Sequence, residues 1–390
     1  MRIAECGQGK VRRNLSGEMA CESFIPADLQ DVVPISLSES TTYQLANCSR
    51  RIGELEGMLR FLPNSGMYLA MYVRKEALLS AQIEGTQCTF DDIMNPERTD
   101  LLRKDVVDVI NYIKASEYAK ERMGALPLCG RLLKETHGIL LSGVRGLEKQ
   151  PGEMRKSQNW IGPTGCTLRE AAFIPPNIED MNAAMARLES FMNDSPPSLD
   201  PIVKAALIHY QFETIHPFLD GNGRLGRLLI TLSLMGDGVL SDASFYPSYQ
   251  LKLHRSEYYK RLMKVRTEGD YEGWIGFFCD CMAASAEDAV DSLKALVELH
   301  DRSNASIVEN MGRSAMNGQR LLELLEGHPI VDIAFIAQEL AVSRTTAANL
   351  VRAFTDSGIL VPFDRDKQRY KLFLYENYLQ ILRKGDAPLR

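Results

Sequence analysis

The chain has 390 residues, of which 45% are hydrophobic and 25% charged, a composition ordinary for a soluble globular protein. This length predicts two or three domains, and the formal net charge of −6 argues against non-specific polyanion binding by the whole chain. No apolar run reaches transmembrane length and no secretory signal precedes the first helix, so no membrane partner is expected. Eight scattered cysteines without zinc-type spacing predict reduced thiols and a cytoplasmic protein.

The chain is predicted to be mainly helical, after a tail over residues 1 to about 25 that shows little periodicity and is expected to be mobile. Hydrophobic periodicity and turn residues place the successive helices. They are expected at about 38–61, 67–84, 101–123, 127–141, 181–192, 201–215, 251–266 and 273–308.

One of these helices, about 67–84, carries a serine and a glutamate on a shared face. Ser80 and Glu84 lie one turn apart, and Gly85 is expected to stop the helix. An acid in the last turn is disfavoured by the helix dipole, so Glu84 would benefit from a cationic partner. A solvated surface glutamate is the alternative interpretation of this string taken alone.

Residues 216–227 hold the most informative stretch, His-Pro-Phe-Leu-Asp-Gly-Asn-Gly-Arg-Leu-Gly-Arg. Gly221, Asn222 and Gly223 can turn the chain so that successive N–H groups point the same way and form an anion site. The apolar run from Leu225 to Leu234 predicts a helix, so that site would lie at a helix N-terminus.

Three charged or titratable groups flank this turn. Arg224 and Arg227 fall on one face of the predicted helix, and Asp220 offers a carboxylate to a hard cation. Pro217 disfavours helical geometry at His216, which is therefore expected at the break, with its imidazole facing a cleft. The stretch predicts a site for a polyphosphate and Mg²⁺ beside a base that accepts a proton.

The last part of the chain, from Arg313, has 11 basic and 9 acidic residues. Helices at 318–326, 333–340 and 343–357, followed by strands at 359–363 and 369–374, predict a winged helix-turn-helix. Such folds commonly place the third helix in a DNA major groove. Acidic residues are interleaved with these basic ones, which argues against DNA binding by this part of the chain. Binding of a protein or of a partner subunit is the alternative. The basic residues available for phosphate contacts are Arg344, Arg352, Arg365, Lys367 and Arg369.

Residues 216–227 resemble the signature of the Fic family, His-x-Phe-x-Asp-Gly-Asn-Gly-Arg-x-x-Arg, at every defining position. Most members of that family transfer AMP from ATP to a hydroxyl side chain of a target protein. The resemblance implies that His216 is the base and that Asp220 holds Mg²⁺. A kinase-type branch carries Lys at the second glycine of the loop, so Gly223 favours nucleotidyl transfer.

The same resemblance implies a nucleotide site. The loop of Gly221, Asn222 and Gly223 would cradle the α- and β-phosphates, Arg224 would bind the β-phosphate and Arg227 the γ-phosphate. Tyr258 and Tyr259 match a position on the adenine and ribose side, with core aromatics as the alternative. The residues expected at the nucleotide site are Glu84, Asp220, Gly221, Asn222, Gly223, Arg224, Leu225, Gly226, Arg227, Tyr258 and Tyr259.

Ser80 to Gly85 resembles the inhibitory motif of the family, in which the glutamate pairs with the second arginine, here Arg227, and blocks the productive γ-phosphate pose. Residues 166–175 resemble the β-hairpin flap on which a target peptide docks as an added strand, and backbone near 170–173 could touch nucleotide. The implied fold is a Fic helical bundle with a short flap and a C-terminal winged helix-turn-helix. Its parts would be 1–100 with the inhibitory helix near 67–85, the catalytic core 101–312, and 313–390.

The expected reaction is transfer of AMP from ATP to a Ser, Thr or Tyr hydroxyl of a target, and of the chain itself. Transfer of UMP, phosphocholine or phosphate by the same site is one alternative, and removal of AMP from the target is another. A third is a transcription regulator whose Fic-like part only senses nucleotide. Dimers are common among such proteins, which makes a homodimer one state to test.

Overall fold

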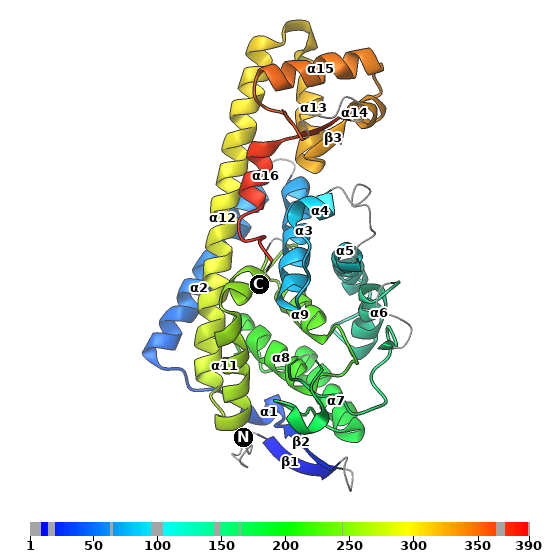
Figure 1. Ribbon diagram of the computed structural model, residues 1–390. Helices are drawn as coiled ribbons and strands as arrows, with labels where there is room; N and C mark the ends of the chain where they lie inside the picture. Colours follow the sequence, from blue (N-terminus) through cyan, green and yellow to red (C-terminus); the bar gives the residue numbers. More distant parts are fainter. Residues whose placement is uncertain are drawn as a thin grey trace.

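A 40-residue helix, α12 (Tyr271–Asn310), runs along one side of the molecule and joins the lower body to an upper group of small elements (Figure 1). Helix α2 (Glu39–Phe61) packs along it, and Arg51 on α2 pairs with Glu287 on α12 at 2.7 Å. This computed structural model describes residues 9–14, 20–62, 65–94, 104–143, 149–163, 165–243, 245–363 and 371–388.

Helix α8 (Pro201–Ile215) forms the core of the lower body. Every residue from Ile202 to Ile215 is buried, because the helix is largely apolar on all sides and suits only an interior position. Asp200 caps its first turn, and Pro201 occupies the first helical position, where no N–H partner is needed. Helices α7 (Ile178–Asp194) and α9 (Asn222–Gly236) pack against it, as do α2 and α12.

The remaining helices of the body surround this core. They are α1 (Leu29–Val32), α3 (Ser65–Ile83), α4 (Phe90–Met94), α5 (Lys104–Met123), α6 (Gly130–Leu140), α10 (Ser248–Leu253) and α11 (Arg255–Glu268). The single helix expected over 251–266 is two helices, because the backbone leaves helical geometry at His254 (φ −106°, ψ 30°). None of the helices in the described ranges is long and apolar enough to cross a bilayer.

A β-hairpin lies where a mobile tail was predicted. Strands β1 (Gly9–Asn14) and β2 (Cys21–Pro26) pair antiparallel with Gly9 opposite Pro26, and the prediction is wrong for these residues. The hairpin has a defined structure because the side chain of Phe24 is buried and packs on Phe173, with ring centroids 6.0 Å apart. Its N–H also donates to the Ile174 carbonyl at 3.0 Å, which ties the hairpin to the body.

The flap region differs in its boundaries from the hairpin expected over 166–175. Ile161 and Phe173 form an antiparallel bridge, and Leu168–Glu170 between them is a 3₁₀ turn rather than a strand. The turn forms because the Glu170 carboxylate accepts hydrogen bonds from the Thr167 N–H and hydroxyl, each 2.9 Å long.

The upper group contains four α-helices and, within the described residues, a three-stranded antiparallel sheet in the order β3-β5-β4. Ser343 caps the third helix as expected, by accepting a hydrogen bond from the Thr346 N–H. The elements are α13 (Ala315–Gly327), β3 (Ile330–Asp332), α14 (Ile333–Glu339), α15 (Arg344–Asp356), β4 (Val361–Pro362), β5 (Leu372–Leu374) and α16 (Glu376–Leu382). Of the basic residues named above, Arg365, Lys367 and Arg369 lie outside the described residues.

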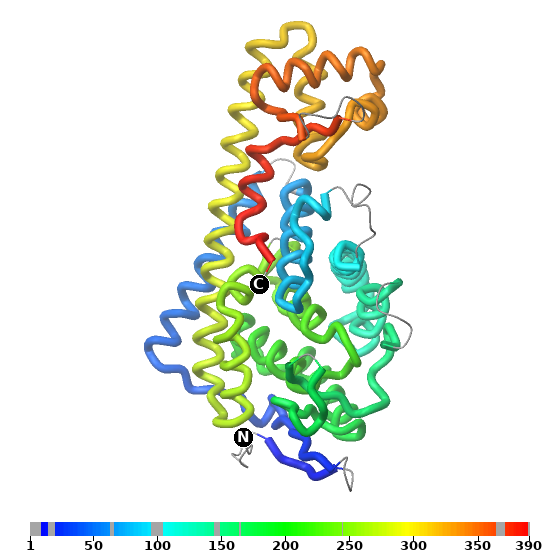
Figure 2. Tube along the Cα trace, in the orientation of Figure 1, coloured from blue at the N-terminus to red at the C-terminus, as the bar shows by residue number. Residues whose placement is uncertain are grey.

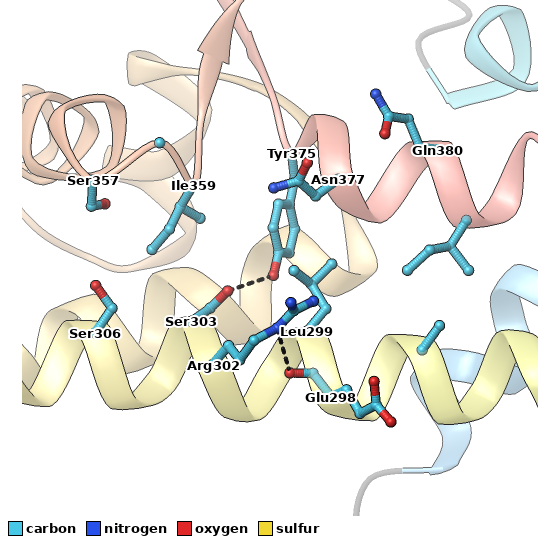
Figure 3. A pocket seen from close by; sticks show the side chains of 13 residues that line it. Glu298, Leu299, Arg302, Ser303, Ser306, Ser357, Ile359, Tyr375, Asn377 and Gln380 are labelled. Atoms are coloured by element: carbon cyan, nitrogen blue, oxygen red, sulfur yellow. Dashed lines mark hydrogen bonds between the residues drawn. The ribbon is translucent and has the colours of Figure 1, made fainter.

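Helix α16 carries the chain from the upper group back to the body, a path that Figure 2 shows in red. It starts at Tyr375, whose hydroxyl hydrogen-bonds to Ser303 of α12 at 3.0 Å beside a groove of about 640 Å³ between the two helices (Figure 3). Beyond α16, Arg383 forms two 2.8 Å bonds with Asp91 of α4.

The segment that follows Arg383 reaches the end of α3. The ammonium of Lys252 donates to the carbonyls of Gly385 at 2.8 Å and Ala387 at 2.6 Å, and to the Gln82 side chain at 2.6 Å. Gln82 in turn donates to the Asp386 carbonyl at 2.6 Å. Gln82 and Asp386, 304 positions apart in sequence, therefore share one polar network.

Candidate active site

His216 ends α8 and turns the chain into the signature loop. Its backbone is left-handed (φ 49°, ψ 61°), a conformation that a non-glycine residue adopts only when its surroundings hold it there. The Nε of Arg155 and the side-chain amide of Asn159 donate to the His216 carbonyl at 3.0 and 3.1 Å. Sequence reasoning assigned neither residue a role, since both lie in a loop about 60 positions away.

The imidazole of His216 lines a cavity of about 160 Å³, as expected for a base at the helix break. Its side chain is 20% exposed. The cavity is smaller than the roughly 300–1,000 Å³ that ligand pockets occupy. Its lining residues are Glu84, Thr86, Asp108, His216, Leu219, Asp220, Gly221, Asn222, Gly223 and Arg224.

Asn222 fixes the loop rather than offering its side chain to a ligand. Its Oδ1 accepts from the Phe218 N–H at 2.9 Å and its Nδ2 donates to the Phe218 carbonyl at 2.8 Å. Both ends of the amide are used in this way and the residue is buried. The contribution of Asn222 to the predicted phosphate loop is therefore to hold the backbone of the loop in place.

Removing this clamp should loosen the loop. Asn222→Ala deletes two buried hydrogen bonds and leaves the Phe218 N–H without a partner, although the Phe218 carbonyl still accepts from Asn159 at 3.0 Å. We therefore expect a loss of about 1–3 kcal/mol in the free energy of unfolding. Urea denaturation measures this change. Asn310→Ala, which deletes an exposed bond to Ser306 on α12, is the control and should change stability by less than about 0.5 kcal/mol.

His137 supports the same loop from α6. Its Nδ1 accepts from the Gly152 N–H at 2.9 Å, so its Nε2 carries the proton and donates to the Asp220 carbonyl at 2.9 Å. The ring stacks on Phe218 with centroids 3.8 Å apart. Burial lowers the pKa of His137 to about 4, which keeps the ring neutral. His137 is therefore packed against the loop and lies outside the lining of the cavity.

The N-terminus of α9, where an anion site was predicted, lies at the cavity. Gly221 is the N-cap with φ 76°, a value that favours glycine. The first N–H groups of a helix have no partner within the helix, and here those of Asn222, Gly223 and Arg224 belong to residues that line the cavity. The turn that glycine permits therefore brings amide donors and His216 to one cavity.

Arg227 is held by the residues that precede Gly85. The guanidinium, 1% exposed, donates from Nε to the Ser80 hydroxyl at 2.9 Å and from Nη2 to the Ser80 carbonyl at 2.9 Å. Nη2 also donates to Glu84 Oε1 at 2.8 Å. Glu84 therefore has the cationic partner that its place in the helix predicted, and it is not an isolated surface acid.

Gly223 makes room for this carboxylate. A Cβ at Gly223 would lie 2.2 Å from Glu84 Oε1, so any side chain there would displace the acid. Burial would raise the pKa of Glu84, but the charge and the hydrogen bond of Arg227, together with the charge of Arg224, outweigh that effect and hold the pKa below its ordinary value. The carboxylate is therefore ionised at neutral pH.

Arg224 brings a buried cation to the wall of the cavity. Its Nη1 lies 3.5 Å from Asp108 Oδ1 and its Nη2 lies 3.8 Å from Asp220 Oδ1. Within the described part of the chain its Nε makes no hydrogen bond. The guanidinium therefore retains donors that an anion in the cavity could accept.

Asp220 fits the role of a single carboxylate ligand. Its Oδ1 accepts from the Gly221 N–H at 2.6 Å, which orients the carboxylate at the cavity wall. Mg²⁺ is usually bound by one or two carboxylates together with substrate phosphates and water. No cluster of three or more acidic, histidine or cysteine side chains suited to a metal occurs among the described residues, so phosphate oxygens would have to complete the shell.

Other residues expected at the nucleotide site lie in the core instead. Tyr258 is buried and donates from its hydroxyl to His209 Nε2 at 2.9 Å, so its assignment to the nucleotide is wrong. Leu225 and Gly226 are buried as well and do not line the cavity. Tyr259, 38% exposed, is the member of the tyrosine pair that remains accessible.

His209 links α8 to α9 and α11. Its Nδ1 donates to the Gly226 carbonyl at 2.8 Å, and burial lowers its pKa to about 3. Between pH 3 and 6.5 the unfolded chain binds a proton at this site that the folded chain does not, so His209 makes stability fall as pH falls.

His209→Gln should remove that effect. We expect the slope of unfolding free energy against pH, between pH 4 and 6, to decrease by about 1.4 kcal/mol per pH unit. Urea denaturation at half-unit pH steps measures the slope for both proteins. An unchanged slope would show that the buried ring already carries a proton in the folded state.

The Fic/DOC family N-terminal model matches residues 42–121 of this chain, and the Fic/DOC family model matches residues 127–234. Fic N-terminal and Fic domains are thus matched over these two successive segments of the chain. The second match contains the whole of α8 and of the signature loop, whose geometry is described above.

Similar proteins include the protein adenylyltransferase Fic of Drosophila grimshawi, 33% identical over 198 residues that cover 50% of this chain and 36% of the relative. The Drosophila melanogaster protein of the same name is 28% identical over 62% of this chain and 46% of its own length. This chain thus spans less than half the length of these curated relatives.

Solved structures support the fold. A Fic family protein from Desulfovibrio desulfuricans G20 superposes with a TM-score of 0.58 at 18% identity, covering 87% of this chain and 97% of that one. A Fic domain containing signaling protein from Bacteroides thetaiotaomicron VPI-5482 has a TM-score of 0.50 at 20% identity, covering 63% and 95%. The mainly helical class predicted from the sequence is confirmed.

Proposed function

We propose that this chain is a protein adenylyltransferase that moves AMP from ATP to a Ser, Thr or Tyr hydroxyl of a target protein and of itself. One observation carries the proposal: the imidazole of His216 and the N-terminal residues of α9 line a single cavity, with Arg224 at its wall. A base and a phosphate site are thereby placed together, as transfer to a hydroxyl requires.

Each residue of the site has a separate role in the proposed reaction. His216 accepts the proton of the attacking hydroxyl. The loop amides at 221–223 bind the phosphates, Arg224 neutralises the β-phosphate, and Arg227, once released, binds the γ-phosphate. Mg²⁺ held by Asp220 would supply further positive charge to the leaving pyrophosphate. Tyr259, the accessible member of the tyrosine pair, would contact the adenine or the ribose.

Burial lowers the pKa of His216 to about 4, with the charge of Arg266 acting in the same direction. The ring is therefore neutral at physiological pH and able to accept a proton. Attack of the hydroxyl oxygen on the α-phosphorus forms the new P–O bond and breaks the bond to pyrophosphate, and the hydroxyl proton moves to His216.

Glu84 would restrain this reaction. Its carboxylate accepts a hydrogen bond from Arg227, which keeps this guanidinium from binding a phosphate. The same carboxylate lies next to Gly223 and fills part of the cavity. We infer that this arrangement is an autoinhibited form, and that a target segment docks at the flap near residues 166–175. We further propose that residues 1–100, 101–312 and 313–390 form the inhibitory, catalytic and C-terminal parts.

The element order α13-β3-α14-α15-β4-β5 supports a winged helix-turn-helix for the C-terminal part. Arg344 and Arg352 are exposed on α15, where a nucleic acid or an acidic protein could meet them. Binding of the full chain to duplex DNA at several salt concentrations separates these partners, because phosphate contacts give a steep salt dependence.

Labelled ATP tests the transfer. The Glu84→Gly protein is incubated separately with ATP labelled at the α- and at the γ-phosphate. We expect label in protein only from the α position. Label from the γ position would instead show phosphorylation, and absence of label from either would contradict a transferase that uses ATP.

A further inference from the structure

A second titratable side chain lies directly behind His216. Glu213 is one turn earlier on α8, and its Oε2 is 4.0 Å from His216 Nδ1, with the Glu213 side chain 8% exposed. Nδ1 itself is fully buried although part of the ring is exposed. The exposed edge of the imidazole is therefore the one opposite Nδ1, and Glu213 lies on the buried side.

The signature contains a residue that makes room for this carboxyl. A Cβ at Gly226 would lie 2.4 Å from Glu213 Oε1 and 3.3 Å from its Cδ. Gly226 was expected to contact nucleotide, but its lack of a side chain lets α9 close over the acid. A side chain at position 226 of α9 would therefore displace the Glu213 carboxyl on α8, and glycine at this position avoids that clash.

The pocket does not neutralise the acid by hydrogen bonds. Within the described residues, Oε1 is buried without a hydrogen-bond partner. A buried acid in this state costs folding free energy, so a hydrophobic side chain would serve stability better. Acids of this kind are concentrated at functional sites.

Several charged or titratable groups face Glu213 from the elements around it. Burial raises its pKa to about 7, Arg227 and Arg266 oppose this rise, and Glu84 adds to it. On α8, the Glu213 carboxyl faces His216. From α11, Tyr258 and Tyr259 also lie close enough to interact electrostatically with Glu213.

We propose that Glu213 is a positioning residue for His216, and that its carboxylate stabilises the imidazolium formed during transfer. This inference depends on the proposed function. The target hydroxyl loses its proton to Nε2 of His216 while its oxygen bonds to the α-phosphorus and pyrophosphate leaves. The ring then carries a positive charge, and Glu213 faces it across Nδ1. The proton later passes from Nε2 to solvent, which restores the neutral ring.

The experiment uses the Glu84→Gly full-length protein as parent and measures initial rates of AMP transfer from pH 5.5 to 9. In Glu213→Gln we expect a rate 10- to 100-fold lower at pH 8 with KM for ATP within twofold. The parent rate should rise as pH passes through about 7, where Glu213 ionises, and this rise should be missing in Glu213→Gln. Glu213→Asp, which keeps the charge, should recover the rise at a reduced rate.

Glu56→Gln is the matched control, since Glu56 is also a buried acid but bonds to Ser241 away from the cavity. Its rate and pH profile should follow the parent. A Glu213→Gln protein within twofold of the parent, with the same rise, would overturn the inference alone. Absence of transfer by the parent would overturn the proposed function and this inference with it. Thermal melting and ATP binding of each variant show that a lost rate does not reflect unfolding.

Discussion

Replacing His216 with alanine is expected to abolish AMP transfer, with a loss of at least 1,000-fold in rate, while ATP affinity changes by less than about threefold. A positioned base contributes about 10²–10⁴-fold to a proton-coupled transfer. The phosphate site should survive, because it is built from backbone amides of α9 and from Arg224 rather than from the imidazole. Label transfer from α-phosphate-labelled ATP measures the rate, and calorimetry measures the affinity.

Loop integrity in this variant rests on bonds that alanine does not remove. The His216 carbonyl would still accept from Arg155 and Asn159. His254→Ala is a suitable control, because His254 is exposed at the junction of α10 and α11, and its transfer rate should be unchanged. Retention of more than a tenth of the rate in the His216→Ala protein would show that another group accepts the proton.

Glu84→Gly should raise self-modification by about 10- to 100-fold. The substitution removes the carboxylate from Arg227 and leaves that guanidinium bonded only to the neutral serine Ser80. Its charge then becomes available to the γ-phosphate, whose binding brings the α-phosphorus toward His216. AMP incorporation into the protein, followed over time by intact mass spectrometry, measures the increase.

Glu84→Gln tests whether the negative charge of Glu84 or the shape of its side chain restrains the transfer. The amide keeps an oxygen that can accept from Arg227 but carries no charge, so we expect an increase between that of the glycine variant and the original protein. Ser80→Ala leaves the carboxylate in place and should change activity less than Glu84→Gly does. If neither substitution at Glu84 alters the rate, the ion pair with Arg227 does not restrain the enzyme.

The sequence predicted those features that depend on a short stretch of chain. Helix α8 begins and ends where expected, because Asp200-Pro201 start it and His216-Pro217 stop it. The contact of Glu84 with Arg227 was predicted as well, although it spans 143 positions. That contact followed from a resemblance to known proteins, since no spacing rule connects α3 to α9.

Features that depend on distant partners could not be predicted in this way. Strand β1 is short and basic, and it is ordered only because β2 pairs with it and Phe24 packs on Phe173. Asn222 is typical of a phosphate loop, yet its amide bonds to Phe218. Tyr258 and Tyr259 are neighbours in sequence, and only the packing of His209 on Tyr258 decides which one is buried.

The path of the chain beyond α16 limits how the protein can be divided. A truncation at residue 312, where the sequence suggests a boundary, would remove the carbonyls of Gly385 and Ala387 that surround the ammonium of Lys252. Burial already lowers the pKa of Lys252 to about 8, and the shortened fragment would leave that cation and Gln82 with fewer partners. The fragment would also uncover Tyr249, against which Gly385 packs too closely for any side chain. Residues 1–312 and 313–390 are therefore best purified and assayed as one piece.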